Sequence, residues 1–81
     1  MTLIELINRC REDLTDESVG VRRSWEDMFR YTLRHYNQQG TLDEFDPAAL
    51  AAFMTAAGMN QTIVEGYEKR WHAVLARYRD C

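Results

Sequence analysis

Apolar residues recur along the chain at intervals of three and four positions, which is the spacing of one face of an α-helix. The first such stretch predicts a helix over about residues 3–14, with Thr2 and Glu5 as its capping box. Its apolar stripe consists of Leu3, Ile7, Cys10 and Leu14. The polar residues 15–18 that follow end this helix and offer several N-cap candidates for the next one.

The longest apolar pattern predicts a second helix over about residues 19–39. Met28 and Thr32 lie on the flanks of its apolar arc, and Gly40 is expected to end it as a left-handed C′ residue. The arc itself consists of Val21, Trp25, Phe29, Leu33 and Tyr36. A short connector follows, and we expect its two apolar residues, Leu42 and Phe45, to point inward.

A third helix is predicted to begin at Asp46, because its carboxylate suits an N-cap. Pro47 then takes the first helical position, where its missing N–H group costs nothing. Gly58 is expected to stop this helix. The residues predicted to face the core are Leu50, Phe53, Met54 and Ala57. Most other positions are alanine, which lets neighbouring elements approach closely.

A fourth helix is predicted to begin between Asn60 and Thr62, with Thr62 and Glu65 as a second capping box. Its apolar stripe consists of Ile63, Tyr67, Trp71, Val74 and Tyr78. Gly66 inside it indicates either close packing or simple tolerance, at a cost of about 1 kcal/mol relative to alanine. Because no stretch of useful length alternates as a strand does, the fold class is predicted to be all-α, with four helices.

Length and composition favour one domain over residues 1–81, because 46% of the residues are hydrophobic and can fill one core. Cys10 lies among helical apolar residues and Cys81 is the last residue, so we expect thiols in a reducing compartment. The sequence has no run of 18 apolar residues and no signal-peptide pattern. We therefore expect a cytoplasmic location and no membrane contact.

Catalysis and metal binding need polar groups that converge, and the sequence does not bring such groups together. His35 and His72 stand in no metal-ligand spacing with each other or with the cysteines. Glu65 and Glu68 lie one turn apart, a pattern that is most often solvated surface. The isolated glycines form no phosphate-binding loop. We therefore predict a protein that is not an enzyme, with no catalytic residue, metal, cofactor or small-molecule substrate.

The net charge of −3 hides an uneven distribution. Residues 18–40 carry four basic and two acidic residues, and residues 60–81 carry four basic and three acidic ones. Basic side chains on these two helices are candidates for contact with the phosphates of duplex DNA. On the second helix the candidates are Arg23, Arg30 and Arg34, which form a stripe with Asp27, and Arg22, which stands on the flank of that stripe. On the fourth helix the candidates are Lys69, Arg70 and Arg77, with the small Ala73 between them. Charge alone leaves open that such arginines only solvate an amphipathic helix.

The order of the predicted elements resembles the N-terminal core-binding domain, a SAM-like four-helix domain, of tyrosine recombinases of the phage-integrase type. The resemblance covers nearly the whole chain and rests on apolar positions and caps, without a chemical motif. It runs through the opening residues 3–6, the second helix from Val21 to Tyr36, the connector 41–46, residues 49–53 of the third helix, and Thr62, Ile63, Tyr67, Trp71 and Leu75 of the fourth.

The resemblance implies a compact four-helix SAM-like orthogonal bundle that forms half of a clamp on duplex DNA, with its second and fourth helices toward the phosphate backbone. It also implies other recombinase protomers as partners, and a separate domain that carries the catalytic residues. The overall acidity departs from this pattern. The alternative is a small helical protein–protein interaction module of phage or regulatory origin, which the acidity, the alanine-rich third helix and the exposed-looking Tyr31 favour.

Overall fold

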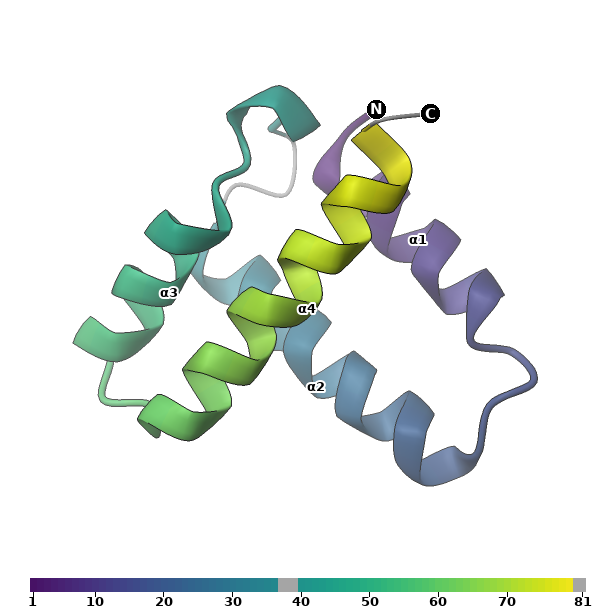
Figure 1. The fold of residues 1–81 in the computed structure, drawn as a ribbon, viewed down its shortest axis with the longest axis horizontal. Coiled ribbons are helices and arrows are strands. Elements are labelled where there is room, and N and C mark those ends of the chain that lie inside the picture. The colour runs from purple at the N-terminus through teal and green to yellow at the C-terminus, as the bar shows by residue number, and fades with distance from the viewer. Residues whose placement is uncertain (37–39, 80–81) are drawn as a thin grey trace. The chain divides into compact units, whose positions relative to one another are not determined.

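The computed structural model describes residues 1–36 and 40–79, which form four α-helices and one short 3-10 helix (Figure 1). No β-strand occurs in this described part of the chain, so the all-α prediction with four helices is confirmed. The chain divides into two compact units, the first over Met1–Phe45 and the second over Asp46–Cys81. The single domain and the SAM-like orthogonal arrangement of the helices stay predictions.

Helix α1 of the first unit spans Leu3–Asp13. The Thr2 hydroxyl accepts a hydrogen bond from the Glu5 amide (3.3 Å), as predicted, and it donates to the Glu5 carboxylate (3.2 Å). The buried side chains of α1 are Leu3, Leu6, Ile7 and Cys10. Leu14, predicted to continue this stripe, is the half-buried C-cap residue.

Helix α2 spans Val19–His35, and the Ser18 side chain caps it by accepting from the Val21 amide (3.3 Å). The predicted end near residue 39 is wrong, since Tyr36 leaves the helix with an extended backbone (φ −135°, ψ 152°). The Tyr36 hydroxyl donates to the Glu44 carbonyl, and its ring meets the Phe45 ring edge-on at 5.0 Å between centroids. These contacts draw the chain away from the helix axis, so Gly40 is not its C′ residue. Residues 37–39 lie outside the described part.

The buried side of α2 is made by Met28, Phe29 and Thr32. Thr32 fits there because its hydroxyl donates to the Met28 carbonyl one turn back (2.7 Å), which satisfies the buried polar group. The predicted arc is only partly correct. Phe29 is fully buried, whereas Trp25 and Leu33 are half-buried and Val21 in the first turn is 40% exposed.

The start of the chain closes the first unit by pairing with the segment before a 3-10 helix, η1 (Leu42–Glu44). Thr2 and Thr41 form an antiparallel bridge. On either side of it, the Leu3 amide donates to the Gly40 carbonyl and the Leu42 amide donates to the Met1 carbonyl, each at 3.1 Å. Leu42 and Phe45 are buried, as predicted.

The second unit consists of α3 (Pro47–Ala56) and α4 (Gln61–Arg79), which pack against each other. The Asp46 carboxylate accepts from the Ala48 amide (3.0 Å), so the predicted N-cap with Pro47 after it is confirmed. Gly58 is also confirmed as the stop, with a positive φ of 87°. The Gly58 amide donates to the Thr55 carbonyl (3.0 Å) and the Met59 amide to the Met54 carbonyl (3.2 Å), which is a Schellman motif.

The predicted core face of α3 is half correct. Its buried residues are Pro47, Leu50, Ala51 and Met54. Phe53 is 54% exposed and Ala57 is exposed, so both predictions for these residues are wrong. The reason is that α3 is apolar on nearly every side, so the spacing of its apolar residues does not determine which side is covered.

Asn60 caps α4, because its side-chain oxygen accepts from the Thr62 amide (2.8 Å); the predicted Thr62 cap is therefore wrong. The buried residues of α4 are Val64, Trp71 and Leu75. Ile63 is 45% exposed, so the predicted stripe is correct at Trp71 and wrong at its start. A Cβ atom added at Gly66 would meet nothing within 4 Å, so close packing does not require a glycine there. Of the two explanations offered by the sequence, the one that remains is that the helix tolerates a glycine at this position.

Candidate nucleic-acid interface

Three of the predicted arginines, Arg23, Arg30 and Arg34, lie exposed along one side of α2. At 100° per residue these positions fall within a narrow arc, opposite the buried Met28 and Thr32. The stripe has this place because the opposite side of the helix is apolar, so the folding of the first unit leaves the arginines in solvent. We call Arg23, Arg30 and Arg34 the arginine face.

Two neighbouring residues of α2, Tyr31 and Asp27, contact the cations of the arginine face. The guanidinium carbons of Arg30 and Arg34 lie 5.5 Å and 5.6 Å from the centre of the half-buried Tyr31 ring. Both distances are within the range of cation–π attraction. Arg30 also pairs with Asp27 (3.0 Å); the Arg30 side chain is 62% exposed and the Asp27 side chain 43% exposed. Arg30 therefore contacts both Tyr31 and Asp27.

Arg22, which was predicted on the flank of the stripe, lies about 100° from Arg23 around α2. It lines a hollow of about 280 Å³ together with Arg11, Leu14, Thr15 and Glu26. Within the described part of the chain, neither Arg22 nor Arg23 forms an ion pair. Both remain available to an anion, but Arg22 is not part of the arginine face.

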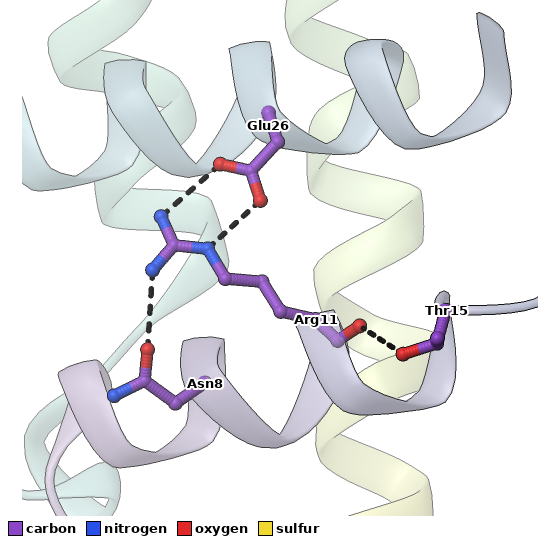
Figure 2. Close-up of polar contacts among 4 residues, drawn as sticks. All are labelled: Asn8, Arg11, Thr15 and Glu26. Atoms are coloured by element: carbon purple, nitrogen blue, oxygen red, sulfur yellow. Dashed lines mark hydrogen bonds and ion pairs between the residues drawn. The ribbon is translucent and has the colours of Figure 1, made fainter. Parts of the chain in front are cut away.

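Arg11 was not predicted as a functional residue, and the structure shows that its guanidinium ties α1 to α2 (Figure 2). It donates to both carboxylate oxygens of Glu26 (2.8 and 3.1 Å) and to the Asn8 side chain (3.1 Å). Its guanidinium carbon also lies 5.6 Å from the centre of the Phe29 ring. At the end of α1, the Thr15 hydroxyl donates to the Glu12 carbonyl (2.8 Å). Arg11 is thus engaged within the fold, which separates it from the arginine face.

The predicted basic residues of α4 belong to the second unit and are less uniform. Lys69 and Arg77 are exposed, whereas Arg70 is half-buried. Arg70 and Arg77 are seven residues apart and share one side of the helix, while Lys69 points about 100° away. The Arg77 guanidinium carbon lies 5.4 Å from the centre of the Tyr78 ring. The structure therefore brings Arg70 and Arg77 to one side of α4 and places Lys69 outside that side.

The two units differ in charge. The first unit has six basic and nine acidic residues, a net charge of −3, whereas the second has four of each and is neutral. The arginine face is therefore a local positive strip on the more acidic unit. Such a strip attracts phosphate only over distances near the screening length of the solution, about 10 Å at 0.1 M salt.

Among the described residues, no group of three or more His, Cys, Asp or Glu side chains is placed to hold a metal ion. His72 instead lies 3.5 Å from Glu68, one turn earlier on α4. Within the same described part, no helix combines the length and apolar character needed to cross a membrane.

Comparisons with known protein families, with curated proteins and with solved structures found no match to this chain. The similarity to a recombinase core-binding domain thus stays a prediction from the order of its helices, and the geometry of the arginine face stands beside it as an independent observation.

Proposed function

We propose that this protein binds duplex DNA through the phosphate backbone, with the arginine face of α2 as its main contact surface. The observation that supports this is the placement of Arg23, Arg30 and Arg34 in solvent on one side of a helix. Arginine presents planar N–H donors that match phosphate oxygens, and most protein–DNA hydrogen bonds go to phosphate and sugar. The resemblance to a recombinase core-binding domain gives this contact a role, which is to hold the DNA while a separate domain cuts it.

In this proposal the binding does not depend on base sequence, because the arginine face offers charge and N–H donors along a single helix. Each phosphate neutralised by a cation releases condensed counterions, so the logarithm of the affinity falls with the logarithm of salt by about 0.9 per contact. Three contacts correspond to a slope of about −2.7. Arg70 and Arg77 of α4 form a second, smaller set that extends the contact if both units meet the DNA.

The test is a titration of a fluorescent 20-base-pair duplex at low salt, followed by anisotropy, with single charge reversals. Arg23→Glu and Arg34→Glu are expected to weaken binding most, because both arginines are exposed and neither has an acidic partner among the described residues. Arg9→Glu is the matched control, since Arg9 is an exposed arginine on α1 and its reversal changes the net charge equally. Lys69→Glu and Arg70→Glu report separately on α4.

Each outcome has a definite meaning. Loss of binding in the α2 reversals with the Arg9 control intact supports the proposal. An equal loss in Arg9→Glu indicates attraction by total charge, without a defined face. No binding by the unchanged protein at low salt overturns the proposal.

A second candidate function is protein–protein interaction through α3, and one observation favours it. Phe53 is 54% exposed beside the exposed Ala52 and Ala56, so this helix presents an apolar strip to solvent. Light scattering over a range of concentrations tests whether a second copy covers the strip. A mass that rises with concentration, and that returns to the monomer in Phe53→Asp, would support this function; a monomer at every concentration would count against self-association.

A further inference from the structure

We infer that Tyr31 is a positioning residue for DNA binding, holding the guanidinium groups of Arg30 and Arg34 ready for two neighbouring phosphates, and that Asp27 competes with DNA for Arg30. The inference rests on the proposed function and adds to it two residues that do not carry positive charge. Tyr31, Arg30 and Arg34 together are called the Tyr31 cluster below.

The geometry places one ring against two cations. Both guanidinium carbons lie within 5.6 Å of the centre of the Tyr31 ring, although the two arginines come from successive turns of α2. A long arginine side chain normally samples many rotamers, and ordering it on a ligand lowers the affinity. A ring that already holds both guanidinium groups reduces that loss, because part of the ordering occurs before DNA arrives.

The spacing of the two arginines suits adjacent phosphates on one strand. Residues four apart on a helix are separated by about 6 Å along its axis. Successive phosphates of one strand are separated by about 3.4 Å along the duplex axis. The long stems of Arg30 and Arg34 can span this difference when the helix crosses the strand at an angle. The Tyr31 cluster therefore fits a pair of phosphates better than a single isolated anion.

Asp27 acts in the opposite direction. Its carboxylate lies 3.0 Å from Arg30, and both side chains are accessible to solvent. A phosphate that approaches Arg30 must share this cation with the carboxylate or displace it, and it is repelled by the negative charge. The substitution Asp27→Asn would keep the size of the side chain and remove its negative charge, and with it the competition for Arg30.

The experiment measures the affinity for the same duplex at several salt concentrations in the full chain carrying Tyr31→Leu, Tyr31→Phe, Arg34→Gln or Asp27→Asn. Tyr31→Leu should weaken binding roughly threefold to tenfold at every salt concentration, from the loss of two cation–π contacts. The slope against salt should not change, because no charge is removed. Arg34→Gln should weaken binding and make the slope shallower by about 0.9. Tyr31→Phe should bind like the unchanged protein, and Asp27→Asn should bind more tightly.

The combined variant Tyr31→Leu with Arg34→Gln tests whether Tyr31 acts through Arg34. If it does, the combined loss is smaller than the product of the two single losses. Circular dichroism confirms the helical content of each variant, and Tyr31→Met replaces Tyr31→Leu if the latter does not fold.

Four results would overturn all or part of the inference, and each has a different meaning. If Tyr31→Leu binds as tightly as the unchanged protein while Arg34→Gln does not, Tyr31 has no positioning role and the proposed function still stands. If Tyr31→Phe is as weak as Tyr31→Leu, the hydroxyl itself contacts DNA. If the unchanged protein does not bind the duplex, the proposed function fails and the inference fails with it. An Asp27→Asn variant that binds no more tightly would overturn the competition by Asp27.

Discussion

The two units of the chain reach helical structure in different ways. The second unit consists of two helices joined by residues 57–60. Asp46 caps the start of α3, Gly58 ends α3, and Asn60 caps the start of α4. The first unit depends on contacts between residues far apart in the sequence, including the Thr2–Thr41 bridge and the Arg11–Glu26 ion pair. Local signals thus organise the second unit, whereas long-range polar contacts complete the first. The following variants test this difference.

The largest effect is expected from removing a buried aromatic side chain in either unit. Trp71 and Phe29 are both fully buried, so Trp71→Ala and Phe29→Ala should each lower the free energy of unfolding by about 3–5 kcal/mol. Urea denaturation followed by circular dichroism measures the change, and NMR spectra show whether a variant loses one unit or both. A loss below about 1 kcal/mol would contradict the burial of that side chain.

The two glycines of the second unit should respond to alanine in opposite directions. Gly58 has a φ of 87°, so Gly58→Ala should lower the free energy of unfolding by about 1–2 kcal/mol. Gly66 lies inside α4 with open space around it, so Gly66→Ala should raise it by about 0.5–1 kcal/mol. Thermal unfolding of both variants checks the signs. Stabilisation by Gly58→Ala would show that the Schellman turn is not maintained in solution.

The start of α4 can be assigned by comparing two caps. Asn60→Ala should lower the free energy of unfolding by about 1 kcal/mol, because the Asn60 side chain accepts from the Thr62 amide. Thr62→Ala should change it by less than about 0.5 kcal/mol. The same thermal measurement serves for both. The reverse order would restore the cap that the sequence pattern predicts.

The smallest effect is expected at the tie between α1 and α2 in the first unit. Arg11 and Glu26 are 41% and 48% exposed, so water and salt screen the pair. A double-mutant cycle of Arg11→Met and Glu26→Gln should give a coupling of about 0.5–1 kcal/mol at low salt. The coupling should fall in 1 M salt. A coupling that does not depend on salt would indicate packing on Phe29 as the main contribution of Arg11.

The sequence predicts the class of the fold and most helix ends, because these follow from short-range chemistry. Thr2, Asp46 and Gly58 act where the pattern places them. The sequence fails where a choice depends on a distant surface. Ile63 and Val64 are both apolar neighbours, and only packing determines that Val64 is the buried one. Helix α2 ends early because Tyr36 bonds to the chain at Glu44, which no local signal indicates.

The candidate site also has a part that follows from the sequence and a part that does not. The arginine face follows from helical spacing, since residues opposite an apolar side point into solvent. Spacing also places Tyr31 outside the apolar arc, but it does not show that the Tyr31 ring contacts both Arg30 and Arg34. The ion pair of Arg11 with Glu26 could not be predicted from the sequence. The two residues lie 15 positions apart on different helices, and helical periodicity does not indicate which residues of two helices meet.

The pairing of the chain start with residues 40–42 bears on the order of folding events. Closing a loop of nearly the whole first unit costs more chain entropy than closing the short turn between α3 and α4. Contacts between distant residues also form more slowly than local ones. We therefore expect the α3–α4 hairpin to appear first, and the bridge at Thr41, together with η1, to form among the last native contacts.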